Sequence, residues 1–172
     1  MSSPVRLLLI FALFGCGLLA GGGLIWYLAY GVKAPPPERR ILEGLDAPVE
    51  IGWGPELSIH ARHLNDAIRA LGYAHGRERA WSVILWRQAA TGRLSEWFGG
   101  PTLELDRLAR HLGLATLART SFDALEAEDK ALIEAYSEGL NVALMSPEGK
   151  LQQELVLLGL EPEPWQPWHT LA

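Results

Sequence analysis

The sequence has little cysteine: one of its 172 residues, Cys16, carries a thiol. A single thiol cannot form a disulfide within the chain, and it cannot supply the thiolates of a cysteine-based zinc site. Basic charge is also scarce, with 15 Lys and Arg against 20 Asp and Glu and a net charge of −5. No nucleic acid is therefore expected as a partner, because binding to phosphates requires a basic surface.

The sequence also lacks a recognisable catalytic motif. No serine lies in a nucleophile elbow, and no glycine-rich loop outside the apolar N-terminus fits a phosphate. His60 and His63 are three residues apart, but His60 falls in a predicted strand, whereas metal ligands at that spacing need a helix. His75, His111 and His169 have no acidic or thiol companion at a useful spacing. We therefore assign no catalytic residue, metal ligand or cofactor to this chain, and its substrate-binding residues stay undefined.

The N-terminus contains a long run without charge, Leu7–Val32. As a helix this run would rise ~39 Å at ~1.5 Å per residue, which exceeds the ~30 Å hydrocarbon core of a bilayer. Trp26, Tyr27 and Tyr30 lie near its end, as an interfacial aromatic belt would. We predict that residues 1–33 are a membrane anchor or signal, with residues 7–32 in the membrane.

Two alternatives to an uncleaved anchor exist. A secretory signal has a shorter apolar region, which disfavours cleavage here. Lipidation at Cys16 is disfavoured because Phe14 is bulky and the apolar run continues past the cysteine.

Beyond the apolar run, residues 34–48 are rich in proline and predict an extended linker. Residues 49–172 predict one folded domain, since 49% of the whole sequence is hydrophobic and 20% is charged. Val49–Trp53 and Leu57–Ala61 are strand candidates around Gly54-Pro55, which predicts a hairpin. The remainder predicts helices, so the fold class is α+β and mainly helical.

The helical part is predicted from apolar spacing and breaker residues. Asn65 or Asp66 starts a helix, and an apolar stripe with Trp81, Ile84 and Leu85 follows before Gly92 interrupts it. Four further segments follow: a helix from Pro101 with Leu105, Leu108, Leu112 and Ala115 on one face and Asp106 outside, a connection at Ser121–Ala127, a helix at Asp129–Met145, and a short helix or strand at Leu151–Leu160.

Seven segments together resemble the penicillin acylase (penicillin amidase) family of N-terminal-nucleophile hydrolases. The resemblance covers Val49 to Trp168. The segments are VEI, IHA, DAIRALGYAHGRER, ATGRLSEWFG, Asp106-Arg107, AYSEGLN and LGLEPEPWQP, in this order. Leu57-Ser58 departs from the family, which usually has Pro-His before this strand's Ile-x-Ala.

The resemblance implies an amide hydrolase with an αββα sandwich fold, made as a precursor that cuts itself into an α and a β chain. The β chain's N-terminal residue is the nucleophile, its own amine is the base, and calcium is often bound between the chains. The nucleophile, the pocket helix and the calcium ligand of the family fall beyond Ala172. Only Arg79 and Glu96 carry over, as structural positions expected to form buried or half-buried pairs.

Two functions follow as hypotheses. In the first, the chain is the N-terminal α-chain part of such a precursor, held on the periplasmic side of the cytoplasmic membrane, and its partner is the β chain. Without that partner, apolar residues such as Trp81, Ile84 and Tyr136 would lack part of their cover. In the second, the chain is a non-catalytic, membrane-tethered helical module.

Overall fold

The structure is a computed structural model that describes residues 15, 17–24, 44–53, 56–146 and 153–172. The chain divides into two compact units, Met1–Glu38 with Trp53–Pro55 and Arg39–Gly52 with Glu56–Ala172, and we describe each by itself. In the first unit, residues 17–24 are helical. Most of the predicted anchor lies outside the described residues. Among the helices of the described residues, none combines the length and the apolar composition that a membrane span requires.

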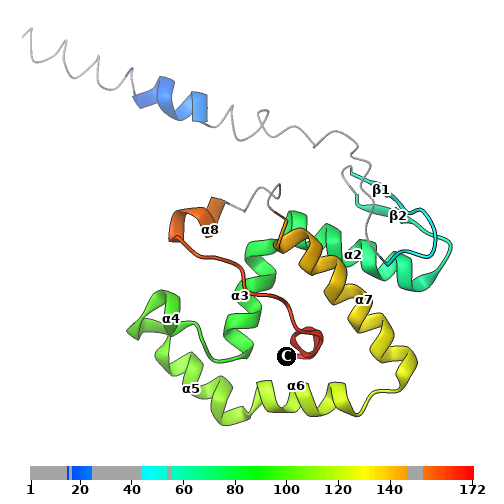
Figure 1. The fold of residues 1–172 in the computed structure, drawn as a ribbon. Coiled ribbons are helices and arrows are strands. Elements are labelled where there is room, and N and C mark those ends of the chain that lie inside the picture. The colour runs from blue at the N-terminus through cyan, green and yellow to red at the C-terminus, as the bar shows by residue number, and fades with distance from the viewer. Residues whose placement is uncertain (1–14, 16, 25–43, 54–55, 147–152) are drawn as a thin grey trace, which may run out of the picture. The chain divides into compact units, whose positions relative to one another are not determined.

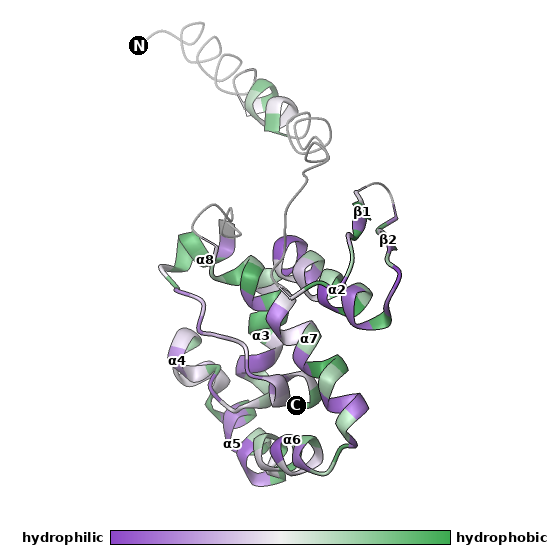
Figure 2. Cartoon of the chain, turned by 45° about the vertical axis from the view of Figure 1, so that its right-hand side comes forward, coloured by the Kyte–Doolittle hydropathy of each residue, from purple (hydrophilic) through white to green (hydrophobic). Residues whose placement is uncertain are grey.

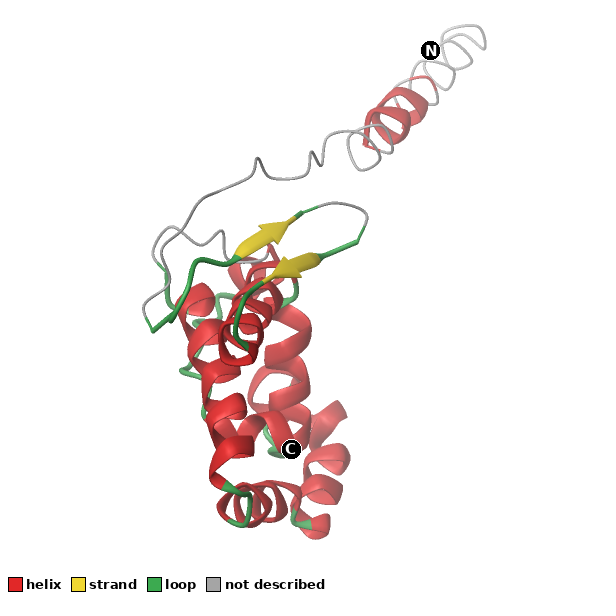
Figure 3. Ribbon diagram, turned by 90° about the vertical axis from the view of Figure 1, so that its right-hand side faces the viewer, coloured by secondary structure: helices red, strands yellow, loops and turns green. Residues whose placement is uncertain are grey.

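The second unit is mainly helical with one small sheet, as the sequence predicts (Figures 1 and 3). Its elements are β1 (Glu50–Gly52), β2 (Ser58–His60), α2 (Leu64–Glu78), α3 (Ala80–Ala90), α4 (Ser95–Phe98), the 3₁₀ turn η1 (Gly100–Thr102), α5 (Leu103–Leu112), α6 (Leu114–Asp123), α7 (Ala127–Leu144), α8 (Gln153–Leu158) and the 3₁₀ turn η2 (Pro167–Leu171).

The two strands form the predicted antiparallel hairpin, with Ile51 opposite Ile59. The helix that follows begins at Leu64, one residue before Asn65, the earlier of the two predicted starts. Asp66 does not cap this helix. Its carboxylate accepts hydrogen bonds from the backbone N–H groups of Asp46 (2.9 Å) and Ala47 (3.0 Å). The end of the predicted linker is therefore part of the folded unit.

Helices α2 and α7 pack against each other at very short range, and glycine makes this possible. A Cβ at Gly72 would overlap the carbonyl oxygen of Tyr136, and a Cβ at Gly139 would overlap that of Arg69. A Cβ at Gly76 would lie 2.7 Å from the Ala143 side chain. Because the backbones approach so closely, the contact is made by small residues and backbone atoms rather than by large side chains.

Breaks in the helices fall at glycines and at one arginine. Gly92, Gly99 and Gly113 adopt positive φ values of 67°, 68° and 67°, a conformation that other residues rarely adopt. The break at Gly113 corrects one prediction. The helix from Pro101 ends there and α6 begins, so Ser121 belongs to a helix and not to a connection. Arg79 separates α2 from α3, with φ −131° and ψ 25°.

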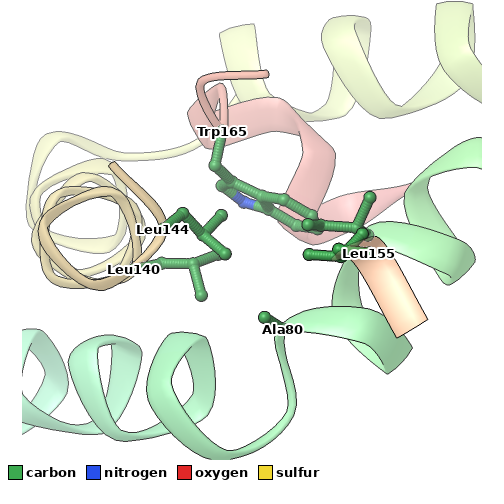
Figure 4. Packing of buried hydrophobic residues seen from close by; sticks show 6 residues of the cluster. Ala80, Leu140, Leu144, Leu155 and Trp165 are labelled. Carbon is green, nitrogen blue, oxygen red and sulfur yellow. The ribbon is translucent and has the colours of Figure 1, made fainter. Parts of the chain in front are cut away.

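A hydrophobic core gathers where α3, α7, α8 and the C-terminal segment meet (Figure 4). Its fully buried members include Ile84, Leu140 and Leu155. Trp165 covers the cluster, and Figure 4 shows its ring between Leu144 and Leu155. Leu151–Leu160, predicted as helix or strand, contributes the helix α8, which Figure 2 shows as predominantly hydrophobic.

Candidate functional site

A histidine and a tyrosine lie within hydrogen-bond distance between α2 and α7, where Nδ1 of His75 is 3.0 Å from the Tyr136 hydroxyl. Burial, and then the charge of Arg79, lower the pKa of His75. Burial raises the pKa of Tyr136. This pair joins α2 to α7, and both pKa shifts favour the neutral form of the side chain. The geometry makes it a structural hydrogen bond, because no nucleophile accompanies it among the contacts of the described residues.

Metal binding finds no support in the described part of the chain. No three His, Cys, Asp or Glu side chains gather there in a way that would hold an ion. His60 lies exposed in β2, and His63 is exposed at the N-terminal cap of α2.

Arg79 and Glu96, the two predicted structural positions, are both exposed, which corrects the expectation that they are buried or half-buried. Arg79 lies at the junction between α2 and α3. Its backbone N–H donates to the carbonyl of His75 (2.8 Å), and its own carbonyl accepts from Val83 (3.0 Å). Arg79 therefore contributes to helix packing through its backbone position between α2 and α3, and not through a buried charge. The structural role of both residues stays a prediction.

Glu96 belongs to a charged cluster with Arg93 and Glu163. Arg93 Nη2 donates to Glu96 (2.8 Å), and Arg93 Nη1 donates to Glu163 (2.9 Å). The hydrogen bonds from Arg93 hold the pKa of both carboxyls below its usual value. Sequence reasoning missed Glu163, which is 70 residues away from Arg93 in the chain.

The C-terminal segment is fixed to the helices by buried polar groups that the sequence did not reveal. Asn141 binds both backbone groups of Trp165: its Oδ1 accepts from the N–H (2.6 Å) and its Nδ2 donates to the carbonyl (2.8 Å). Arg87 is 3% exposed and donates to the carbonyl of Glu163 (3.0 Å). These bonds position Trp165 over the core, so residues 161–168, EPEPWQPW, which we call the Pro/Trp segment, pack as part of the fold.

Asp106 organises the turn between α3 and α5. It was predicted to face outward, but it is 2% exposed. Its carboxylate accepts from the backbone N–H groups of Leu94 and Ser95, each at 2.8 Å. Burial alone would raise the pKa of Asp106, but hydrogen bonding by the Ser95 side chain and by the two backbone N–H groups outweighs burial and lowers it. Arg110 Nε donates to the carbonyl of Gly92 (2.9 Å) and closes the same turn.

With Asp106 turned inward, the leucines of α5 turn outward and line an apolar groove of about 520 Å³. Figure 2 shows that α5 carries both hydrophobic residues (green) and hydrophilic residues (purple). We call this hollow the α3–α5 groove, and its lining residues are Leu85, Trp86, Ala89, Leu94, Phe98, Thr102, Leu105, Leu108, Ala109, Leu112 and Leu114. Trp86 is 73% exposed, Leu105 56% and Leu112 59%.

The residues that line this groove are not the ones that the family resemblance predicted to lack cover. Ile84, one of those residues, is 1% exposed and belongs to the core. Trp81 and Tyr136 are partly buried and pack against the same core. The apolar pattern identified α5 as amphipathic but assigned its leucine face to the interior.

Comparison with known proteins identifies the class of this fold. The sequence model of the penicillin amidase family matches residues 57–172. Penicillin acylase 2 proenzyme from Pseudomonas sp. (strain SE83) is 43% identical over 134 residues, which is 76% of this chain and 17% of that protein. Acyl-homoserine lactone acylase QuiP from Pseudomonas syringae pv. syringae (strain B728a) is 33% identical over 109 residues, which is 63% of this chain and 13% of that protein.

The fold comparison agrees. The thermostable penicillin G acylase from Alcaligenes faecalis superposes with a TM-score of 0.63 and 19% identity, covering 72% of this chain and 68% of that one. This chain therefore belongs to the penicillin amidase family. It spans less than a fifth of the length of the curated relatives described above.

Proposed function

We propose that this chain is the N-terminal portion of a penicillin acylase-like precursor that hydrolyses a linear amide bond of an acylated substrate. The observation that carries the proposal is the 43% identity to a penicillin acylase proenzyme over 134 residues that make up 17% of it. The nucleophile belongs to the β chain, which this chain lacks. By itself, the chain hydrolyses nothing.

The chemistry of the proposed complete enzyme follows its class. The N-terminal hydroxyl of the β chain attacks the amide carbonyl carbon, and its α-amino group takes the hydroxyl proton and passes it to the leaving nitrogen. Water then hydrolyses the acyl-enzyme ester. The contribution of the present chain is the scaffold: α2 and α7 clasped through glycine, and the Pro/Trp segment fixed by Asn141.

The test is to assay the purified full chain against phenylacetyl, aliphatic acyl and acyl-lactone amides, alone and co-expressed with the remainder of the Pseudomonas SE83 proenzyme. We expect turnover only in the second sample. Saturable turnover by the chain alone would contradict the proposal. Complexes that form and hydrolyse no amide would support a non-catalytic module instead.

The proposed location is the periplasmic side of the cytoplasmic membrane, with residues 7–32 as the anchor. The support is the uncharged run with its terminal aromatic residues. Cells that express the full chain are fractionated beside cells that express residues 35–172. We expect the full chain in the membrane fraction with its N-terminus intact, and equal solubility of the two would refute the anchor.

A further inference from the structure

We propose that His169 is an acid-sensitive latch for the C-terminal segment, residues 161–171. In its neutral form the ring holds the turn η2 against the helices, and protonation of the ring releases the segment while the helices remain folded. Release takes Trp165 off the hydrophobic core that it covers (Figure 4). This inference does not depend on the proposed function, because it concerns how the chain holds its own C-terminal segment.

The turn η2 is closed by a hydrogen bond that requires an unprotonated ring nitrogen. Nδ1 of His169 accepts from the backbone N–H of Gln166 (2.9 Å), and the Gln166 side chain accepts from the His169 N–H in return. A protonated imidazole donates from both nitrogens and has no acceptor left. Protonation therefore sets two donors against each other at the start of η2 and opposes the turn.

The ring also lies between two tryptophans that carry cations. Its centroid is 5.2 Å from that of the Trp165 ring and 4.0 Å from that of the Trp168 ring. The guanidinium carbon of Arg87 lies 5.9 Å from the Trp165 ring centre, and that of Arg119 lies 3.9 Å from the Trp168 ring centre. A protonated His169 adds a third positive charge to this half-buried cluster, which disfavours its charged form.

The other charges near the ring leave this repulsion in place. Glu163, on the same segment, is negative, but both of its carboxylate oxygens accept hydrogen bonds from Arg93. Helix α7 contributes Asn141, which is uncharged. Burial, and then the charges of Arg87 and Arg119, lower the pKa of His169 from 6.5 to about 4. In the released segment the ring regains its ordinary pKa, so binding of a proton below pH 6.5 favours release.

The C-terminal segment can open without the helices that hold it. Its polar attachments lie in side chains: Asn141 binds both backbone groups of Trp165, and Arg87 donates to the carbonyl of Glu163. The α2–α7 contact is made instead where glycines meet helix backbone, and these groups do not titrate. Segments held by few contacts open at a lower free energy than the core of a protein. Acid therefore releases the segment before it unfolds the helices.

The experiment measures hydrogen–deuterium exchange of the full chain in mild detergent by mass spectrometry at pH 7 and pH 5, corrected for the intrinsic effect of pH on exchange. Carboxylates remain mostly ionised over this range. His169→Asn keeps an acceptor that cannot be protonated. His111→Asn is the matched control, because His111 is exposed on α5.

We expect the protection of residues 161–171 to fall at least fivefold from pH 7 to pH 5 in the unaltered chain and in His111→Asn, and less than twofold in His169→Asn. The amides of α7 should stay at least a hundredfold better protected than the segment at both pH values. An equal acid response in His169→Asn would overturn the proposal. So would equal protection of the segment and α7 at pH 5, since acid would then unfold the chain as a whole.

A second measurement needs no substitution, so it applies even if His169→Asn misfolds. The titration of the His169 ring is followed by NMR in the unaltered chain. We expect the ring of the docked segment to titrate well below its ordinary pKa of 6.5. A ring that titrates at its ordinary pKa while the segment stays protected would contradict the latch, because protonation would then leave the docked segment undisturbed.

Discussion

The α2–α7 contact and the α3–α5 groove handle apolar surface in opposite ways. In the first, glycines remove side chains and let two backbones meet: Gly72 faces the backbone of α7, and Gly139 faces that of α2. In the second, large side chains are present and stay open to solvent, with Trp86 73% and Leu112 59% exposed. The closest packing in the described unit thus involves its smallest residues, and a row of leucines lies on its outside.

The difference separates the residues that stabilise the fold of this chain from the apolar residues that remain on its surface. A contact through glycine has no spare volume, so a substitution there acts on folding. An open leucine already faces water, so its removal leaves the folding equilibrium nearly unchanged. The predictions below test this separation, from the largest expected effect to the smallest.

Gly139→Ala should have the largest effect. Its methyl group would overlap the carbonyl oxygen of Arg69, which belongs to a helix backbone and cannot rotate away. We expect a loss of about 3 kcal/mol or more in the free energy of unfolding, at or beyond the upper end for overpacked sites. Urea unfolding followed by circular dichroism measures it. Gly100→Ala is the control, since a Cβ there has nothing within 4 Å, and equal stabilities of the two variants would contradict the close contact.

Asp106→Ala should come next. It leaves two N–H groups, those of Leu94 and Ser95, without their acceptor in a turn that is largely buried. We expect a loss of about 2–3 kcal/mol, since each hydrogen bond to a charged group contributes about 1.5–3 kcal/mol and water replaces part of it. Glu104→Ala is the matched control, because Glu104 is an exposed acid that pairs with Arg107 on the same helix. If both variants unfold alike, Asp106 does not fix the turn.

Asp106 also shows where sequence reasoning reached its limit. The spacing of Leu105, Leu108 and Leu112 correctly indicated an amphipathic helix, but periodicity gives two faces without saying which one is covered. Which face of the helix lies inside was decided by the contacts of Asp106 with Leu94 and Ser95, twelve and eleven residues away. The same limit hid Glu163 and Asn141, whose partners lie 70 and 24 residues away.

Other parts followed from local signals. The hairpin followed from two short apolar runs around Gly54-Pro55, and α7 followed from its apolar spacing. Gly92 was predicted as a break and has the positive φ that such a break requires. The close pairing of α2 with α7 was not predicted, because glycine has a low helix propensity. Its role in packing becomes visible only when the backbone of the neighbouring helix is known.

The pH dependence of stability should report on the C-terminal segment. Burial, and then the charge of Arg87, lower the pKa of His169 from 6.5 to about 4. The neutral ring also accepts a hydrogen bond from the Gln166 N–H at Nδ1 (2.9 Å), which protonation would remove. Between pH 4 and 6.5 the unfolded chain therefore binds more protons, so stability falls as the pH falls through this window.

The expected loss is roughly 1–2 kcal/mol, below the full linkage value because the ring is only half-buried and solvent screens it. Urea unfolding at a series of pH values measures the slope. His169→Asn keeps an acceptor that does not titrate and should flatten it. An equal slope in this variant would assign the pH dependence to other groups, such as Glu163.

The smallest effect should come from Leu112→Ala. Leu112 is 59% exposed on the groove, so its removal takes little apolar surface out of the folded state, and we expect a change within about 0.5 kcal/mol. Leu140→Ala is the same substitution at a 0% exposed position in the core, where it should cost about 3 kcal/mol through lost burial and a cavity. Both are measured on the chain alone by urea unfolding. A loss at Leu112 comparable to that at Leu140 would mean that the groove closes on itself in solution, and the leucines of α5 would then belong to the core of this chain rather than to its surface.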